Sequence, residues 1–144
     1  MKSYEYSLNL LSARAYTERN LRRKLVQKEF DPDEIEATVA RLVSARLIDD
    51  QKFAEEFSRQ RLVSGRSSVR RVVQDLAKRG IPITDARAAA AKICEEEEVD
   101  QTKAVEIAAR KKLASMNGLD TPTQRRRLFA FLARRGFYIS EIKL

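Results

Sequence analysis

Three six-residue stretches align without gaps and decide the fold: LVQKEF at 25–30, LAKRGI at 76–81 and LARRGF at 132–137. Each stretch has a leucine, two spacer residues, a basic residue, then Gly or Glu, and finally a large apolar residue. The apolar ends are separated by 51 and then by 56 residues. A pattern that returns at such intervals predicts a tandem repeat in which every copy is one structural unit.

The similarity among the copies extends well before these stretches. Each copy places an apolar residue four positions before its leading leucine, and an arginine two positions before that residue. These pairs are Leu21 with Arg19, Val72 with Arg70, and Leu128 with Arg126. Agreement over this distance in three copies strengthens the prediction of a repeat.

Every copy is predicted to form three helices, because its apolar residues recur at helical spacing. The expected helices are 4–14, 18–29 and 32–46 in the first copy, 50–63, 68–79 and 84–94 in the second, and 100–115, 122–135 and 140–144 in the third. Thr17, Ser67 and Thr121 suit the N-cap positions of the middle helices. Gly80 and Gly136 suit the position just beyond two of those helices, where a positive φ favours glycine.

The predicted fold is therefore all-α, with three tandem three-helix repeats that are similar to distorted helix-turn-helix units. We expect the repeats at 1–48, 49–98 and 99–144. A unit of that size buries too little surface to be stable alone, so the copies are expected to stack into an elongated, curved array. The chain has only 4 glycines and 3 prolines, which argues against an all-β sandwich with its frequent turns.

The composition argues against several classes of protein. The 144 residues include one cysteine, Cys94, and no histidine, so neither an internal disulfide nor a His/Cys metal cluster is expected. The sequence has no glycine-rich phosphate loop and no nucleophile with an activating partner, which predicts a non-enzyme without a cofactor. No apolar run approaches the roughly 20 residues of a membrane span, and the early acid Glu5 does not suit a signal peptide. We expect a cytoplasmic protein with no membrane attachment.

The net charge of +8 predicts a polyanionic partner, either nucleic acid or a nucleoprotein. This charge is uneven, with +2 in residues 1–48, 0 in 49–98 and +6 in 99–144. The middle helix of each copy has an outward, mainly basic face that strengthens toward the C-terminus, although a merely solvated helix face is the alternative reading. The candidate residues for binding RecA or DNA, the partners introduced below, are Arg19, Arg23, Arg70, Arg71, Lys78, Arg125, Arg126, Arg127, Arg134 and Arg135.

The third helices do not have the composition of base-reading elements. A recognition helix presents base-contacting side chains near its N-terminus. In the first copy those positions hold the acids Glu34 and Glu36, and the third helix of the second copy is rich in alanine. Acids repel phosphate, so nucleic acid should be contacted through its backbone by the middle helices, with little sequence specificity.

Several of these stretches together resemble the RecX family. LRRKL at 21–25 with FDPDEI at 30–35 is similar to the first RecX repeat, and LIDDQKFA at 47–54 is similar to the junction that follows it. GRSSVRR at 65–71 with LAKRGI is similar to the second repeat, and LARRGF is similar to the third. Two features depart from the family pattern: Ser67 and Ser68 replace a common Gly-Pro, and the final helix is short.

The resemblance implies a regulator that lies in the groove of the RecA–single-stranded-DNA filament. Such a regulator bridges neighbouring RecA protomers, blocks filament extension, and lowers ATPase, strand-exchange and coprotease activity, with effects on recombinational DNA repair and the SOS response. The implied partners are the RecA filament and single- or double-stranded DNA, bound without sequence specificity by a monomer. Two alternatives stay open: a helix-turn-helix transcription regulator, and a helical-repeat scaffold for an acidic protein partner.

Overall fold

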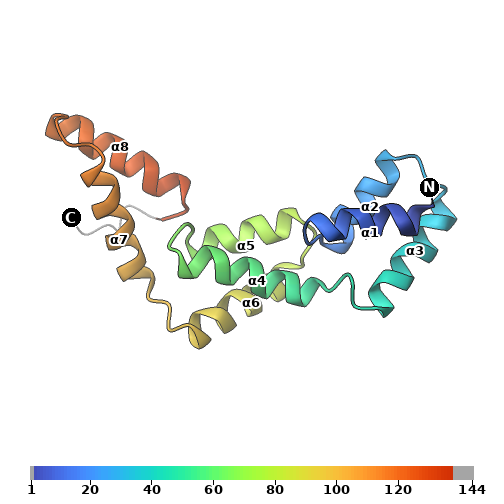
Figure 1. The fold of residues 1–144 in the computed structure, drawn as a ribbon. Helices are drawn as coiled ribbons and strands as arrows, with labels where there is room; N and C mark the ends of the chain where they lie inside the picture. The colour runs from blue at the N-terminus through green and yellow to red at the C-terminus, as the bar shows by residue number, and fades with distance from the viewer. Residues whose placement is uncertain (1, 138–144) are drawn as a thin grey trace.

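The computed structural model describes residues 2–137, which form eight helices and no strand (Figure 1). The helices are α1 (Ser3–Ala13), α2 (Glu18–Gln27), α3 (Pro32–Ser44), α4 (Asp50–Val63), α5 (Val69–Lys78), α6 (Ile83–Glu96), α7 (Gln101–Ala114) and α8 (Thr121–Arg134). The predicted all-α fold is confirmed. The helix predicted at 140–144 lies outside the described residues.

The helices follow one another along an elongated, bent array (Figure 1). The group α1–α3 lies at one end, α4–α6 lie in the middle, and α7 and α8 lie at the other end. Each group has its own buried apolar cluster or clusters, which contain Leu21 and Leu25 in the first group, Leu76 in the second and Leu132 in the third. The array of three-helix repeats is therefore confirmed, while the boundaries at 1–48, 49–98 and 99–144 stay a prediction.

The residues that define the repeat form the centre of these cores. The leading leucines, and the apolar residues four positions before them, lie on the middle helices α2, α5 and α8. Each has 0% of its surface exposed: Leu21, Leu25, Val72, Leu76, Leu128 and Leu132. The i, i+4 spacing places each pair on one face of its helix, so both side chains enter the same core.

All three middle helices end with the same backbone geometry. The residue just beyond the helix has a positive φ, which is 66° at Glu29, 94° at Gly80 and 90° at Gly136. The next residue donates its backbone N–H to the carbonyl of the leading leucine, at 3.3 Å from Phe30, and at 3.1 Å in both other copies. The quoted stretches are therefore helix ends, and their apolar last residue folds back over the helix that it follows.

Two of the predicted N-caps are wrong by one residue. Thr17 caps α2 as predicted, but Ser68 rather than Ser67 caps α5, because the backbone of Ser68 is extended and its hydroxyl accepts a hydrogen bond from the first turn. The backbone of Ser67 is still hydrogen-bonded to the end of α4. The helix α8 already includes Thr121, and Asp120 precedes it.

The first and second groups of helices meet where the N-terminus of α2 touches the C-terminus of α5. We call this contact the first joint. Thr17 Oγ1 donates a hydrogen bond to the carbonyl of Arg79 at 2.7 Å, and the guanidinium of Arg19 donates to the carbonyl one residue earlier. The backbone N–H of Glu18 donates to a carboxylate oxygen of Asp50, the first residue of α4, at 2.9 Å.

The second and third groups meet in the same way, at a contact that we call the second joint. Ser68 Oγ and an Nη of Arg70 donate to the carbonyl of Gly136, at 2.8 and 2.7 Å. The backbone N–H of Val69 donates to the side-chain oxygen of Gln101, the first residue of α7, at 2.9 Å. The two joints therefore use equivalent residues, and the array is built from one repeated contact as well as one repeated unit.

Candidate functional site

A basic groove of about 700 Å³ lies beside the second joint, and we call it the α5–α6 groove. Its cations are Arg70 and Lys78 on α5 and Arg87 on α6, and the described residues that line it include no carboxylate. Apolar side chains share the lining, among them Ile83, which is 51% exposed. The groove therefore combines positive charge with apolar surface.

A second basic groove, of about 590 Å³, lies between α7 and α8 and extends to the turn after α4. We call it the α7–α8 groove. Its cations are Arg66, Lys111, Lys112 and Arg135, again without a carboxylate among the described lining residues. The Lys112 ammonium and the Arg135 guanidinium lie 5.1 and 4.3 Å from the centre of the Phe131 ring. Cations over an aromatic ring offer both charge and a stacking surface, which suits a nucleotide chain.

Both grooves depend on the second joint. The α5–α6 groove includes Gln101 and Gly136 from beyond that joint. In the α7–α8 groove, Arg135 Nη1 donates to the carbonyl of Gly65, in the turn that precedes α5, at 3.3 Å. The relative position of the second and third helix groups therefore sets the shape of both basic grooves.

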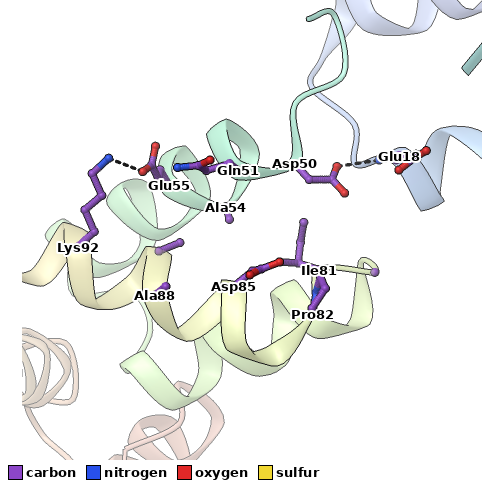
Figure 2. Close-up of a pocket in the computed structure, with 12 residues that line it drawn as sticks. Glu18, Asp50, Gln51, Ala54, Glu55, Ile81, Pro82, Asp85, Ala88 and Lys92 are labelled. Carbon is purple, nitrogen blue, oxygen red and sulfur yellow. Dashed lines mark hydrogen bonds and ion pairs between the residues drawn. The ribbon is translucent and has the colours of Figure 1, made fainter. Parts of the chain in front are cut away.

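The groove at the first joint has the opposite charge (Figure 2). It has a volume of about 630 Å³, and four of its lining residues are acidic: Glu18, Asp50, Glu55 and Asp85. Its one lining base is Lys92, whose ammonium lies 2.5 Å from a carboxylate oxygen of Glu55. An excess of carboxylates disfavours a polyanion there, so the two joints differ sharply in the partner that they would attract.

Asp50 is the acid in this groove whose pKa is shifted. Burial raises the pKa of its carboxyl above the ordinary value, because a charged group loses solvation, and the hydrogen bond from the Glu18 N–H opposes this only in part. Figure 2 shows this hydrogen bond between α2 and α4. At the second joint the neutral amide of Gln101 makes the equivalent contact without that cost.

The ten predicted binding residues fall into three sets in the structure. Arg19 and Arg70 donate hydrogen bonds across the joints. Arg71 pairs with Asp75 at 3.3 Å, and Arg135 packs over Phe131. The others have exposed side chains that make no hydrogen bond or ion pair with a described residue: Arg23, Lys78, Arg125, Arg126, Arg127 and Arg134.

Four cations of the grooves were not predicted from the sequence: Arg66, Arg87, Lys111 and Lys112. The run of bases from Arg110 to Lys112 was a visible signal, but it lies on a first helix rather than a middle helix. Arg87 stands alone in an alanine-rich helix, and only the packing of α6 against α5 brings it near Lys78.

Other features of the described residues limit the chemistry of the site. Cys94 packs against the core around Leu76, and burial raises the pKa of its thiol. Residues 2–137 contain no group of three side chains suited to holding a metal ion. Within the same residues, no helix has the length and apolar character needed to cross a membrane.

Comparisons with known proteins place this fold in a family. Models of the first, second and third three-helix domains of RecX match residues 4–42, 49–89 and 98–143. The regulatory protein RecX of Amycolatopsis mediterranei is 32% identical over 136 residues, which cover 94% of this chain and 76% of that protein. The chain belongs to the RecX family. The regulatory protein RecX of Syntrophotalea carbinolica is 34% identical over 136 residues, which cover 94% of this chain and 88% of that protein.

Solved RecX structures have the same fold. A crystal structure of regulatory protein RecX matches with a TM-score of 0.78 and 22% identity, over 97% of this chain and 69% of the other. The structure of RecX from Lactobacillus salivarius matches with a TM-score of 0.74 and 21% identity, over 97% and 89% of the two chains. The curated RecX relatives are named regulatory proteins, so a regulatory role is the function that family membership supports.

Proposed function

We propose that this RecX-family chain binds the RecA–single-stranded-DNA filament in its groove and inhibits its extension. It thereby lowers the ATPase, strand-exchange and coprotease activities of RecA, and modulates recombinational DNA repair and the SOS response. It acts in the cytoplasm as a monomer, without a cofactor and without catalysing a reaction. The observation that carries the proposal is the pair of basic grooves at the second joint of a RecX fold.

The charge of these grooves supports a partner made of protein and nucleic acid. Arginine binds phosphate and carboxylate through the same bidentate geometry, so the grooves suit both DNA phosphates and acidic residues of RecA. Their apolar side chains, Ile83 and Phe131 among them, offer contact to bases or to apolar side chains. Binding to single- or double-stranded DNA should therefore be independent of sequence.

The third helices support the same proposal, because they are poor recognition helices. Asp33 and Glu34 lie in the first turn of α3, and Asp85 lies in the first turn of α6. Those turns would face the bases if either unit docked as a helix-turn-helix. Acids there oppose entry into a groove flanked by phosphates.

The elongated shape supports simultaneous contact with several subunits of a filament. Each unit has its own core, and the two joints hold the units in a fixed series. A rod of this kind can bridge neighbouring protomers at separate points along its length, and a ligand that bridges protomers also blocks the addition of the next one.

The test measures RecA ATPase and filament extension on single-stranded DNA with increasing amounts of the chain. We expect inhibition that weakens as salt rises. The double variant Lys111→Gln with Lys112→Gln should inhibit less, and if the contacts are to phosphate, its log-affinity against log-salt slope should fall by roughly 1 per lost contact.

The matched control is Arg23→Gln with Lys24→Gln, which removes the same charge from α2, outside both grooves. This control should inhibit like the wild type. Equal loss in both variants would mean that net charge, and not the α7–α8 groove, governs binding. Sequence-dependent binding to duplex DNA with no effect on RecA would instead favour a transcription regulator, and no affinity for either DNA or the filament would favour a protein scaffold.

A further inference from the structure

Each joint brings together two different faces of the repeat. The donor face is the N-terminus of a middle helix, with a hydroxyl at the cap and an arginine two residues later, as in Thr17 with Arg19. The acceptor face is the C-terminus of the next middle helix, with its free carbonyls and a glycine. Two joints use two faces of each kind, so a three-unit array leaves one acceptor face on α2 and one donor face on α8.

The glycine of an acceptor face is needed because the donor face approaches so closely. A Cβ on Gly80 would lie 2.7 Å from Cβ of Arg19. A Cβ on Gly136 would lie 2.5 Å from Ser68 Oγ and 2.6 Å from Cβ of Arg71. Real Cβ atoms do not approach backbone-proximal atoms to such distances, so any side chain at this position would push the two units apart.

The unused acceptor face on α2 has a side chain at this position. Glu29 takes the place of Gly80 and Gly136, with the same helix-ending hydrogen bonds and a positive φ of 66°. A glutamate in this conformation is strained, whereas glycine would adopt it freely. Its exposed side chain occupies the space that a donor face would need.

The unused donor face on α8 is also altered. The helices α2 and α5 begin at Glu18 and Val69, but α8 begins at Thr121, one turn before the equivalent residue Arg125. Gln124 stands where the other copies have a capping hydroxyl, and its side chain donates to the carbonyl of Met116 at 3.0 Å. The added turn therefore covers the surface that would otherwise contact an acceptor face.

We propose that Glu29 and the added turn of α8 are end stops, which prevent the chain from docking end to end with a second copy through the contact that it uses internally. A head-to-tail contact of this kind does not close on itself, so without stops it would propagate into open fibres. Repeat arrays need distinct terminal units for the same reason. This inference concerns self-association and is independent of any RecA partner.

The first test restores both faces in the full chain. In one variant Glu29→Gly opens the acceptor face; in another, residues 121–123 are deleted and Gln124→Ser places a hydroxyl directly before Arg125. Sedimentation velocity over a range of concentrations should show monomers for the wild type and for each single change, and concentration-dependent oligomers when both changes are combined. A combined variant that stays monomeric with native helical content would overturn the proposal, as would a wild type that already associates.

Two further variants identify the contact in the oligomer. Replacing Glu29→Gly by Glu29→Ala in the combined variant keeps a Cβ, and should return the protein to a monomer. Adding Arg126→Ala should also dissociate it, since Arg126 is in register with Arg19 and Arg70. Oligomers that survive both changes would form by another route, which would contradict the proposal.

The last test does not depend on the trimmed helix. Gly80→Glu puts the end-stop residue into the first joint, and small-angle X-ray scattering should show a larger radius of gyration. Gly118→Glu is the control, because Gly118 has a similar φ of 92° but nothing within 4 Å of the added Cβ, so its radius should not change. An unchanged radius for Gly80→Glu would mean that a glutamate does not block the joint, and the end-stop role of Glu29 would fall with it.

Discussion

At the scale of single residues, equivalent positions in the repeat have different surroundings. Arg19, Arg70 and Arg126 share one register, yet the first two donate hydrogen bonds across joints and the third is exposed. A helical projection shows that all three point away from the core of their own unit. It does not show whether the next unit covers them, so the sequence predicted the direction of these side chains but not the internal use of two.

This difference predicts unequal effects of two alanine substitutions in α2. Arg19→Ala should lower the free energy of unfolding by about 1 kcal/mol, because a charged donor across the first joint is lost. Arg23→Ala removes an exposed side chain from the same helix and should stay within about 0.5 kcal/mol of the wild type. Urea unfolding followed by circular dichroism measures both, and equal losses would show that the Arg19 contact does not stabilise the joint.

Asp50 predicts a pH-dependent stability difference. Its raised pKa means that the folded state disfavours the carboxylate, so Asp50 costs stability above that pKa, and the cost disappears as pH falls below the unfolded value of about 3.8. Asp50→Asn keeps an acceptor for the Glu18 N–H without the charge, as Gln101 does at the second joint.

The Asp50→Asn variant should therefore be at least as stable as the wild type at pH 7. Its advantage should shrink as the solution is acidified, because the wild-type carboxyl then takes up a proton and loses its penalty. Thermal unfolding of both proteins between pH 7 and pH 4 measures this difference. An advantage that grows on acidification would show that the hydrogen bond, and not burial, dominates the pKa of Asp50.

At the scale of helices, periodicity predicted most of the fold. The expected helix at 50–63 is α4 (Asp50–Val63) itself, and the one at 84–94 is α6 (Ile83–Glu96), because apolar spacing and helix ends are local properties of the sequence. The grooves were not predicted, because their linings combine helices whose packing no single-helix pattern encodes. Arg87 and Lys78, nine positions apart on different helices, share a groove only after α6 packs on α5.

The exposed face of α8 predicts a binding defect without a folding defect. Arg126→Ala with Arg134→Ala removes two exposed guanidinium groups from the helix group with the largest net charge, so affinity for the RecA–DNA filament should fall several-fold. The thermal midpoint should barely move. Arg23→Ala with Lys24→Ala, which removes the same charge from α2, should weaken binding less. Fluorescence anisotropy of labelled filaments measures this, and equal damage from the α2 pair would contradict a partner that prefers the C-terminal units.

At the scale of the whole molecule, joint geometry links the two basic grooves. Gly136→Ala adds a Cβ that would collide with Ser68 Oγ at 2.5 Å, so the second joint should open and both grooves should lose their shape. Affinity for single-stranded DNA should fall although every cation remains, and the radius of gyration should rise. Gly118→Ala has the same backbone strain at a φ of 92° and open space around it, so it should bind DNA normally. Loss of binding in both variants would attribute the effect to strain alone.

The joints also give the molecule an electrical direction. At each joint the partial positive pole of one middle helix meets the partial negative pole of the next, so α8, α5 and α2 place their peptide dipoles in series and compensate one another internally. Two poles remain without a partner helix, the positive one at the start of α8 and the negative one at the end of α2. The positive pole falls in the segment that already has a net charge of +6. A polyanion approaching from solution therefore exerts a torque that turns the α8 end toward it before any contact forms, and salt would weaken this alignment before it weakened the bound state.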